Sequence, residues 1–439
     1  MAIATLPADD PRSIMADSPM RLRQIVAVTV CFLLNALDGF DVLAVTFAAP
    51  GIAKDWAVGP GAIGIIVSTG LVGMVIGSLT LGQLADRIGR RRQILLCLGI
   101  MTIGMFASAF AMGVVSLGLL RVLTGLGLGA MLAAINAMSA EFANRRRRDL
   151  AVSIMAAGYP VGGIIGGWGA AQLLRTHGWE AIFLFGGVAT LAMVPLVLAF
   201  LPESIGWLAT RGGPNALARI NAILRRLGQP QAAQLIALEE PKASMRSLFA
   251  DRYRVVTIAL IVMYGLHMMT FYYALGWAPS LVVVLGFDPS RATIVSVFMN
   301  SGGAIGGLVL GLLSPRLGLR PLVIFGLAGA AVAVAAFGAV PPELVLLQGA
   351  AFVLGFLSNG SVVGLYALIA NVYPTTLRAT GTGAVIGFGR FGAAFGPFAA
   401  GQLLAAGAGR GTTSLLLALG SGIAALVLLA SRIRPADEN

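Results

Sequence analysis

The chain has 439 residues, of which 58% are hydrophobic and only 11% are charged, and 58 of them are glycine. This balance excludes a soluble globular protein, and apolar stretches of about twenty residues, enough to cross a bilayer as helices, recur along the chain. The net charge of +12 does not indicate nucleic-acid binding, because the arginines lie mostly in the connections between these stretches.

Twelve membrane-spanning helices are predicted, so the expected fold class is an all-α membrane protein. In chain order they cover residues 25–48, 61–84, 93–113, 115–139, 150–174, 179–201, 254–284, 290–312, 321–341, 343–370, 379–406 and 411–432. The segment before the first span is polar and lacks an apolar core, which predicts no cleavable signal peptide. Cys31 and Cys97 fall inside apolar spans and indicate no disulfide or metal framework.

Positive charge is distributed unequally between the two sides of the predicted membrane. Of the 30 lysines and arginines, 24 lie in the terminal segments and connections of one side and four on the opposite side. Because lysine and arginine accumulate in cytoplasmic loops, both termini are predicted to lie in the cytoplasm of a multi-pass protein. The same charges would contact the anionic heads of the lipid bilayer.

The connection at residues 202–253 divides the spans into two groups of six. The predicted units are a cytoplasmic tail (1–24), a six-helix bundle (25–201), a cytoplasmic central loop (202–253), a second six-helix bundle (254–432) and a tail (433–439). Within the loop, "ALARINAILRRLG" places its leucines and isoleucines on one helical face. This segment is either a helix lying on the cytoplasmic leaflet or an ordinary amphipathic linker.

The two groups of spans carry an internal repeat. "GQLADRIGRRR" follows the second span and "GLLSPRLGLRP" follows the eighth, so that Gly82 aligns with Gly311. The same alignment brings "GYPVGG" of the fifth span onto "GFGRFG" of the eleventh. The repeat predicts two pseudo-symmetric six-helix bundles with a substrate between them near the membrane midplane. "GFGRFG" also matches a dinucleotide-binding pattern, but it follows no strand, so helix packing is expected there.

Several motifs resemble the major facilitator superfamily over nearly the whole chain. They are "GQLADRIGRRR", "RVLTGLGLG" at 121–129, "LPESIGW" after the sixth span and "YPTTLRATGTG" at 373–383. "LDGFD" in the first span is typical of its aromatic acid:proton symporter branch. One departure is Pro315, which stands where the first copy of the loop has Asp86.

Asp38 and Asp41 lie in the middle of the first span, three positions apart and therefore on one helical face. Each carboxyl costs roughly 2.5–3.5 kcal/mol at the bilayer centre, so both are expected to face a cavity or a partner. A carboxyl that takes up a proton on one side and releases it on the other is a coupling site. The alternative is an ion pair with Arg121 that holds the first and fourth spans together; the resemblance implies that Arg121 takes part in proton transfer.

The predicted substrate site lies in the second group of spans. Arg390, inside the eleventh span, would anchor a carboxylate by charge-assisted bonds, unless it reaches back to the cytoplasmic rim. The other candidates are His267, Tyr264, Tyr272, Asn300 and Asn359. The histidine would relay a proton, bind a substrate hydroxyl or bond a neighbouring helix. The tyrosines would stack a planar ring or form an interface belt, and most intramembrane asparagines are expected to join helices.

The connection after the second span is expected to form a gate. The resemblance implies a latch made of Gly82, Asp86, Arg87, Gly89, Arg90, Arg91 and Glu141. Asp86 would cap the cytoplasmic start of the eleventh span, where the helix dipole is positive. The arginines would meet Glu141 at the end of the fourth span.

The function expected from these residues and this resemblance is proton-coupled uptake of a small aromatic carboxylate, such as a hydroxybenzoate, across a bacterial cytoplasmic membrane. Protons are the coupling ion, no cofactor or nucleic acid is implied, and a monomer is expected. The alternatives are a proton-coupled exporter of the same fold and a membrane sensor that does not transport. A membrane enzyme is disfavoured, because HExxH, CxxC and GxSxG motifs are absent from the sequence.

Overall fold

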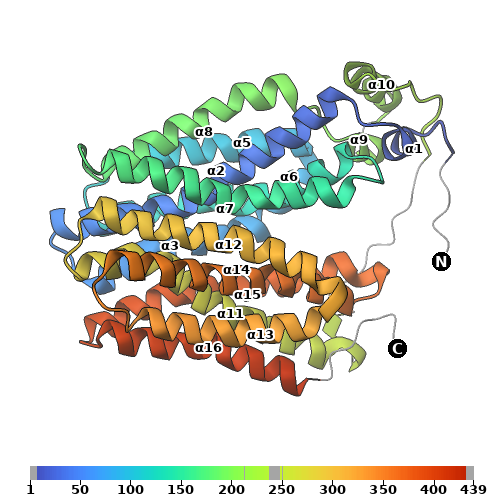
Figure 1. The fold of residues 1–439 in the computed structure, drawn as a ribbon. Helices are drawn as coiled ribbons and strands as arrows, with labels where there is room; N and C mark the ends of the chain where they lie inside the picture. Colours follow the sequence, from blue (N-terminus) through green and yellow to red (C-terminus); the bar gives the residue numbers. More distant parts are fainter. Residues whose placement is uncertain (1–6, 212, 237–247, 250, 432–439) are drawn as a thin grey trace.

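Twelve long helices make up most of the described part of the chain (Figure 1). The computed structural model describes residues 7–211, 213–236, 248–249 and 251–431. The long helices are α2 (Leu22–Asp55), α3 (Pro60–Leu79), α5 (Arg90–Ala109), α6 (Val114–Phe142), α7 (Arg148–Leu173), α8 (Glu180–Phe200), α11 (Asp251–Val284), α12 (Pro289–Leu317), α13 (Leu319–Phe337), α14 (Leu344–Val372), α15 (Thr375–Ala405) and α16 (Arg410–Ala430). The short ones are α1 (Pro11–Asp17), the 3₁₀ helix η1 (Leu81–Leu84), α4 (Ala85–Ile88), α9 (Ile205–Arg211) and α10 (Ala216–Leu227).

The long helices form two bundles that lie one above the other in Figure 1. The N half consists of α2, α3 and α5–α8, and the C half of α11–α16. The halves meet chiefly through α3 with α15 and α7 with α12, and α2 also contacts α11. The internal repeat in the sequence relates α3 to α12 and α7 to α15. The contact of α3 with α15 is therefore the symmetry equivalent of the contact of α12 with α7. The predicted fold class of two pseudo-symmetric six-helix bundles is confirmed.

Ten helical segments within the described residues are long and apolar enough to cross a membrane. Two further long helices, α5 and α15, pack in the same bundles and complete the twelve predicted spans. Several helices are longer than the predicted spans, because polar residues at their ends continue the helical hydrogen bonding. Helix α2, for example, has 34 residues. Lys242, Arg246, Arg432 and Arg434, which contribute to the predicted charge asymmetry, lie outside the described residues.

Glycines let the helices approach closely within each half. A Cβ at Gly162 of α7 would overlap the carbonyl oxygen of Ala36 on α2, and one at Gly392 of α15 would overlap the carbonyl oxygen of Gly265 on α11. In a bilayer, where water does not drive helices together, such close backbone contact is a main source of association. In "GFGRFG", Gly389 and Gly392 thus pack α15 against α11, as the sequence predicts.

Gly162→Ala is expected to destabilise the N half, because the new methyl group meets backbone and the helices must move apart. Overpacking of this kind costs about 1–3 kcal/mol. The melting temperature of the purified protein in detergent should fall by several degrees. Gly99→Ala in α5 is the matched control, since a Cβ there meets nothing within 4 Å, and equal stability of the two variants would contradict the packing role of Gly162.

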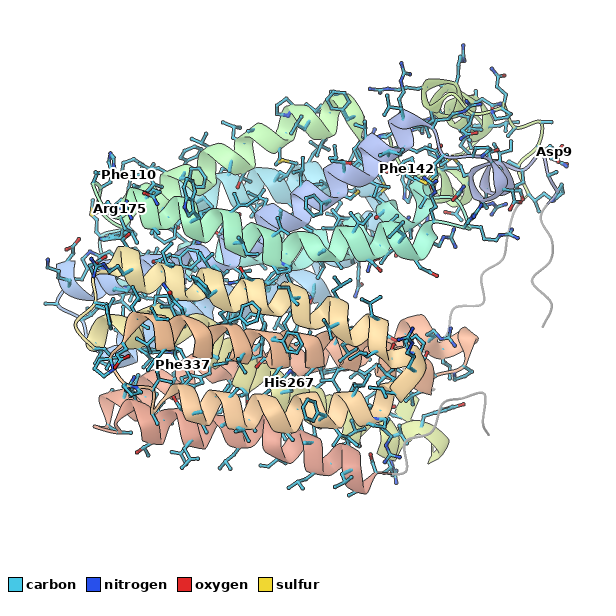
Figure 2. The ribbon with its side chains drawn as sticks, viewed as in Figure 1. Asp9, Phe110, Phe142, Arg175, His267 and Phe337 are labelled. Atoms are coloured by element: carbon cyan, nitrogen blue, oxygen red, sulfur yellow. The ribbon has the colours of Figure 1, made fainter. Side chains whose placement is uncertain are left out.

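One end of the N half carries α1, α9 and α10, and we call it the basic end. Figure 2 shows Asp9 and Phe142 at this end, and Phe110 and Arg175 at the other, which we call the opposite end. Helix α10 packs on α9 and buries Ile220, Leu224 and Leu227. Its apolar face therefore contacts protein rather than lipid, which supports the linker interpretation of this segment over a helix lying on the leaflet.

The N-terminal segment and the central loop are joined by polar contacts. Arg12 pairs with Asp10 at 2.8 Å and donates a hydrogen bond to the carbonyl oxygen of Ile236 at 2.7 Å, and Gln229 donates to Gln24 at 2.7 Å. Burial by itself would raise the pKa of Asp10, but the hydrogen bonds from Arg12 and from the backbone hold it below its usual value. The carboxylate is thus charged at neutral pH and can keep the loop attached to α1.

Candidate functional site

Asp38 and Asp41 lie in the interior of the protein, on the part of α2 that is surrounded by other helices. Each is only 1% exposed, and one carboxylate oxygen of each, Oδ1, has no hydrogen-bond partner. The other oxygen of Asp41 accepts a hydrogen bond from Thr190 of α8 at 3.5 Å. Neither carboxyl faces lipid, and both are closed off from bulk water in this conformation.

Arg121 of α6 is 2% exposed and bonds to neutral groups. It donates to the hydroxyls of Ser108 at 2.6 Å and Thr124 at 3.0 Å, and its guanidinium lies 4.7 Å from the ring centre of Phe183. Asp41 is near enough to interact electrostatically but forms no ion pair with it. This conformation therefore lacks the ion pair between the first and fourth spans that was the alternative to a coupling site.

Arg390 lies about midway along α15 and interacts electrostatically with a carboxyl and three phenols. They are Asp38 of α2, Tyr264 and Tyr272 of α11 and Tyr366 of α14. At 1.5 Å per residue, Arg390 is about 22 Å from the start of α15. Asp38 and Tyr264 are buried, Tyr366 is 37% exposed, and the arginine thus interacts electrostatically with groups of both halves. Asp38 belongs to the N half and the other groups to the C half.

A narrow cavity lies between the halves. It is lined by Tyr159, Pro160, Phe271, Leu275, Met299, Asn300, Gly303, Gly355 and Asn359. Its volume is about 10 Å³, room for roughly one water molecule. The cavity would have to widen before it could hold an aromatic ring.

The two predicted asparagines reach this cavity from α12 and α14. The amide NH₂ of Asn300 donates to the carbonyl oxygen of Ser296 at 2.9 Å, and that of Asn359 donates to the carbonyl oxygen of Gly303 at 2.8 Å. Both amide groups thus donate within the protein, and the side-chain carbonyl oxygens remain as acceptors. They suit a ligand that brings hydroxyl donors.

The tyrosines form a cluster that the sequence predicts only in part. The hydroxyl of Tyr264 donates to the hydroxyl of Tyr366 at 3.2 Å, and Tyr272 packs edge-to-face on Phe271 with ring centres 5.3 Å apart. Tyr159 and Tyr366 were not among the predicted site residues. Each is a lone tyrosine within an apolar span, which is the only signal the sequence offers for them. The buried hydroxyl oxygen of Tyr159 has no hydrogen-bond partner.

His267 is a correction to the predicted substrate site. It is fully buried inside the C half (Figure 2), where one ring nitrogen contacts the hydroxyl of Ser421 at 2.8 Å and the other the carbonyl oxygen of Ser358 at 3.1 Å. Both nitrogens are thus used within the bundle and none is left for a substrate. The histidine joins α11 to α14 and α16, one of the alternatives considered from the sequence.

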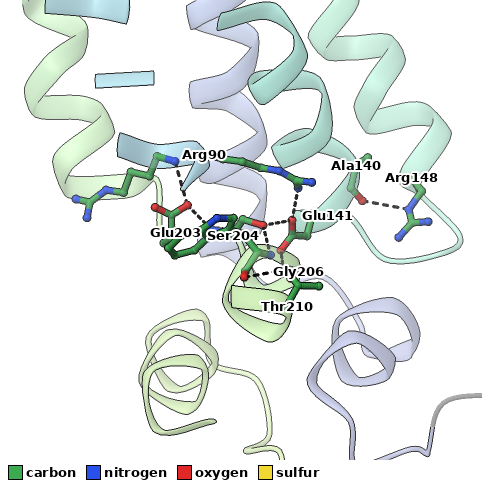
Figure 3. Close-up of polar contacts among 10 residues, drawn as sticks. Arg90, Ala140, Glu141, Arg148, Glu203, Ser204, Gly206 and Thr210 are labelled. Atoms are coloured by element: carbon green, nitrogen blue, oxygen red, sulfur yellow. Dashed lines mark hydrogen bonds and ion pairs between the residues drawn. The ribbon is translucent and has the colours of Figure 1, made fainter. Parts of the chain in front are cut away.

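Two of the predicted gate residues, Arg90 and Glu141, meet in a polar cluster at the basic end (Figure 3). Arg90 forms an ion pair with Glu141 at 2.6 Å, and the same carboxylate accepts hydrogen bonds from the Ser204 hydroxyl and the Gly206 backbone, both at 2.7 Å. These contacts join α5, α6 and α9. One of them, between Arg90 and Glu141, is the contact expected from the sequence. Ser204 belongs to the "LPESIGW" motif and was not among the predicted gate residues.

Glu203 is a second acidic residue of this cluster, and the sequence does not predict its role. Its carboxylate accepts from the backbone N–H groups of Arg91 at 3.0 Å and Ser204 at 2.9 Å. Gly89 has φ +99°, a left-handed conformation that glycine adopts freely, and a Cβ there would lie 2.5 Å from Glu203 Oε2. Gly89 thus ends α4 and makes room for the carboxylate at the start of α5.

The remaining gate residues do not form the expected latch in this conformation. The side chains of Asp86 and Arg87 are exposed. Asp86 uses its backbone carbonyl to accept from Trp207 at 3.1 Å. Gly82 lies in η1, where its carbonyl oxygen accepts from Gln93, and Arg91 donates to the carbonyl oxygen of Leu198 at 2.6 Å. Among the side chains that the structure describes, none bonds to the Asp86 carboxylate, and capping of α15 by Asp86 stays a prediction.

Glu141→Gln is expected to weaken the joint between α5, α6 and α9. The amide keeps the shape but removes the charge that Arg90 and the Gly206 N–H bind, and losing a partly exposed, charge-assisted contact should cost about 1–2 kcal/mol. The central loop should then be cut faster by trypsin in membrane vesicles. The matched control is Glu343→Gln at the start of α14, and cleavage no faster than in that control would contradict the role of Glu141.

The fold and the site together define a class of protein. Two pseudo-symmetric bundles of membrane-spanning helices hold buried carboxyls and an arginine near the midpoint of their interface, the arrangement of a secondary transporter rather than an enzyme. The family model described as Major Facilitator Superfamily matches residues 31–340 and 260–439, and the chain belongs to this superfamily.

Similar proteins include several bacterial transporters of aromatic acids. The chain is 35% identical to a gallate transporter of Pseudomonas putida over 97% of this chain and 96% of that protein. It is 32% identical to a 4-hydroxybenzoate transporter of Acinetobacter baylyi over 90% and 88%, respectively. Among solved structures, the xylose transporter XylE from Escherichia coli matches with a TM-score of 0.74 at 17% identity, over 94% of this chain and 98% of that one. That similarity confirms the fold.

Proposed function

We propose that this protein takes up a small aromatic carboxylate, such as a hydroxybenzoate, together with protons across a bacterial cytoplasmic membrane. The basic end faces the cytoplasm, as the distribution of lysine and arginine indicates. Asp38, Asp41 and Arg121 couple the protons, and Arg390 anchors the carboxylate. The names of the related transporters support an aromatic acid as the substrate.

The observation that carries this proposal is the position of Arg390 between the halves, where Asp38 is its one acidic neighbour in the described interior. A carboxylate substrate and an ionised Asp38 would compete for the same guanidinium. Protonating Asp38 frees Arg390 for the substrate, so binding of a proton and binding of the anion favour each other. This linkage is the requirement for symport.

The energetics favour this arrangement. An anion entering a negative interior is opposed by about 2.3 kcal/mol per charge per 100 mV. One accompanying proton cancels this opposition, and each further proton adds a driving force of the same size. Because Asp41 lies three positions from Asp38 on α2, and farther from the basic end, a proton arriving from the opposite end would reach it first.

The gate cluster fits the same cycle. The contact of Arg90 with Glu141 keeps the basic end of the N half together, while the Asp86 side chain is exposed. We infer that the halves are unlatched at the basic end here, and that Asp86 would cap α15 when the protein opens to the outside.

Uptake of a panel of radiolabelled aromatic acids into cells that express the protein tests the proposal directly. Benzoate, 4-hydroxybenzoate, 3,4-dihydroxybenzoate and gallate should be compared with and without a proton uncoupler. Accumulation of at least one of these acids that disappears with the uncoupler is expected. Accumulation insensitive to the uncoupler would refute proton coupling, and efflux driven by protons would replace uptake by export.

Ring hydroxyls should be recognised by the acceptors of the central cavity. Asn300→Ala and Asn359→Ala are expected to raise the KM for 4-hydroxybenzoate about tenfold, the effect of one lost hydrogen bond, and to leave uptake of benzoate nearly unchanged. Asn136→Ala is the matched control, because Asn136 is exposed on α6 and does not line the cavity. An equal loss for both substrates would contradict hydroxyl recognition.

A further inference from the structure

Arg121 occupies a binding place made entirely of neutral groups. Besides Ser108 and Thr124, its guanidinium contacts the carbonyl oxygen of Gly104 at 3.3 Å and the sulfur of Met105 at 3.3 and 3.4 Å. All of these groups except Thr124 belong to the outer half of α5, and Phe183 of α8 covers the guanidinium. We call the contacts with Gly104, Met105, Ser108 and Thr124 the neutral seat.

Met105 lies beside both Arg121 and Asp41. Its sulfur touches the guanidinium, while a Cβ placed on Gly186 of α8 would overlap the Met105 methyl and come within 3.3 Å of Asp41 Oδ1. That carboxylate oxygen has no partner, and neither does Nε of Arg121. An acceptor and a donor of opposite charge are thus both unsatisfied, and the flexible Met105 side chain lies close to the two residues that carry them.

We propose that the neutral seat is where Arg121 rests when Asp41 carries a proton, and that Arg121 leaves it to pair with Asp41 once the proton departs. Ser108 and Thr124 are positioning residues for this movement, and Met105 is the side chain that moves aside. Arg121 can rest in the seat without a carboxylate, because one of its terminal nitrogens donates to two hydroxyls and a carbonyl oxygen, while Nε stays unpaired. The inference depends on the proposed function, in which Asp41 is a coupling residue.

Other ionisable groups near the pair are few in the described residues. From α2, Asp38 and Asp41 face this region; α3 carries no ionisable residue. Helix α8 carries only Glu180, at its outer end, and α5 carries Cys97 and the arginines at its basic end. Helix α7 brings Tyr159, and Arg148 and Asp149 at its basic end, while α11 brings Tyr272; both tyrosines interact with Asp38. Arg390 is the cation of the C half that interacts with Asp38. A change in the pH dependence after altering the seat would therefore report on Asp41 and its neighbour Asp38.

The sign of the expected change follows from the exchange of partners. Weakening the seat disfavours the state with protonated Asp41 and leaves the ion pair of Arg121 with ionised Asp41 unchanged. Asp41 then needs more acid to take up its proton. The midpoint of the pH dependence of uptake should shift to lower pH by about one unit, which corresponds to a tenfold change in the protonation equilibrium.

The experiment uses the full-length protein in right-side-out membrane vesicles, with radiolabelled 4-hydroxybenzoate, or gallate if its uptake is faster. Thr124→Val and Ser108→Ala should each lower the midpoint pH of uptake. Exchange of internal for external substrate, which requires no net proton movement, should keep its wild-type rate and show that the variants are folded. Thr124→Ser retains the hydroxyl and should keep the wild-type midpoint.

Thr102→Val is the matched control, since the Thr102 hydroxyl bonds only to Leu98 of its own helix. Unchanged midpoints in both Thr124→Val and Ser108→Ala would overturn the inference, as would an equal shift in Thr102→Val. If Ser108→Ala fails to fold, the contrast between Thr124→Val and Thr124→Ser decides alone. If uptake by the wild-type protein did not depend on pH, the proposed function itself would be refuted. That outcome differs from a pH-dependent wild type whose midpoint the seat variants leave unchanged, which would refute only the role of the seat.

Discussion

Asp41→Asn is expected to abolish accumulation of substrate against its gradient while exchange of internal for external substrate continues. The amide has nearly the shape of the carboxyl, but it can neither bind nor release a proton. The buried position, 1% exposed with one oxygen unpartnered, means that the carboxylate has no other cation to stabilise it than Arg121 or a proton. Without the titrating group the concentration ratio across the membrane should fall to about one.

The measurement is uptake and exchange of radiolabelled 4-hydroxybenzoate in vesicles with an imposed pH gradient. Asp55→Asn is the matched control, because Asp55 is an exposed residue at the opposite end of the same helix, where it accepts a hydrogen bond from Trp179 at 3.0 Å. Asp38→Asn should also lose accumulation, and because it removes the competitor for Arg390 it should bind substrate at higher pH than the wild type. Normal accumulation by either interior variant would show that this aspartate is not a coupling site.

Arg390→Gln is expected to raise the KM for an aromatic carboxylate by about 10- to 100-fold. A charge-assisted hydrogen bond contributes about 1.5–3 kcal/mol, and glutamine keeps donors but loses the charge. Arg390→Lys should recover only part of the affinity, since an ammonium is a point charge and lacks the fork that pairs with both carboxylate oxygens.

Initial rates of uptake over a range of substrate concentrations separate this effect from a loss of protein, which would lower only the maximal rate. Arg316→Gln serves as the control, because Arg316 is exposed at the end of α12. A KM for Arg390→Gln equal to that of the control would place the carboxylate elsewhere, and the tyrosine cluster would then be the next site to examine.

The repeating elements of this protein are predictable from the sequence because they depend on local patterns. Each span needs about twenty apolar residues, and all twelve were found with only their ends misplaced. The two bundles follow from the alignment of "GQLADRIGRRR" with "GLLSPRLGLRP". Burial of Asp38 and Asp41 is also predictable, since a carboxyl in a membrane-spanning segment must avoid lipid.

The partners of individual polar residues are less predictable, because they depend on helix rotation and on the conformation the transporter adopts. A histidine in a membrane-spanning segment is a reasonable candidate for binding substrate. The rotation of α11, however, turns His267 toward Ser421 and Ser358, inside the C half. Glu203 and Ser204 complete the cluster around Glu141, although no charge pattern in the sequence distinguishes them from other loop residues.

The sequence by itself determined a twelve-helix membrane protein with two related halves and interior charges, because bilayer thickness and the cost of unpaired charge act on each segment separately. Only the tertiary structure decided that Arg121 rests on hydroxyls rather than on Asp41, that Arg390 interacts with Asp38 across the two halves, and that Arg90 meets Glu141 and Ser204. These pairings join residues from different helices. Their distances are fixed by close packing at glycines and by the state of the transport cycle, and neither is encoded in any one segment.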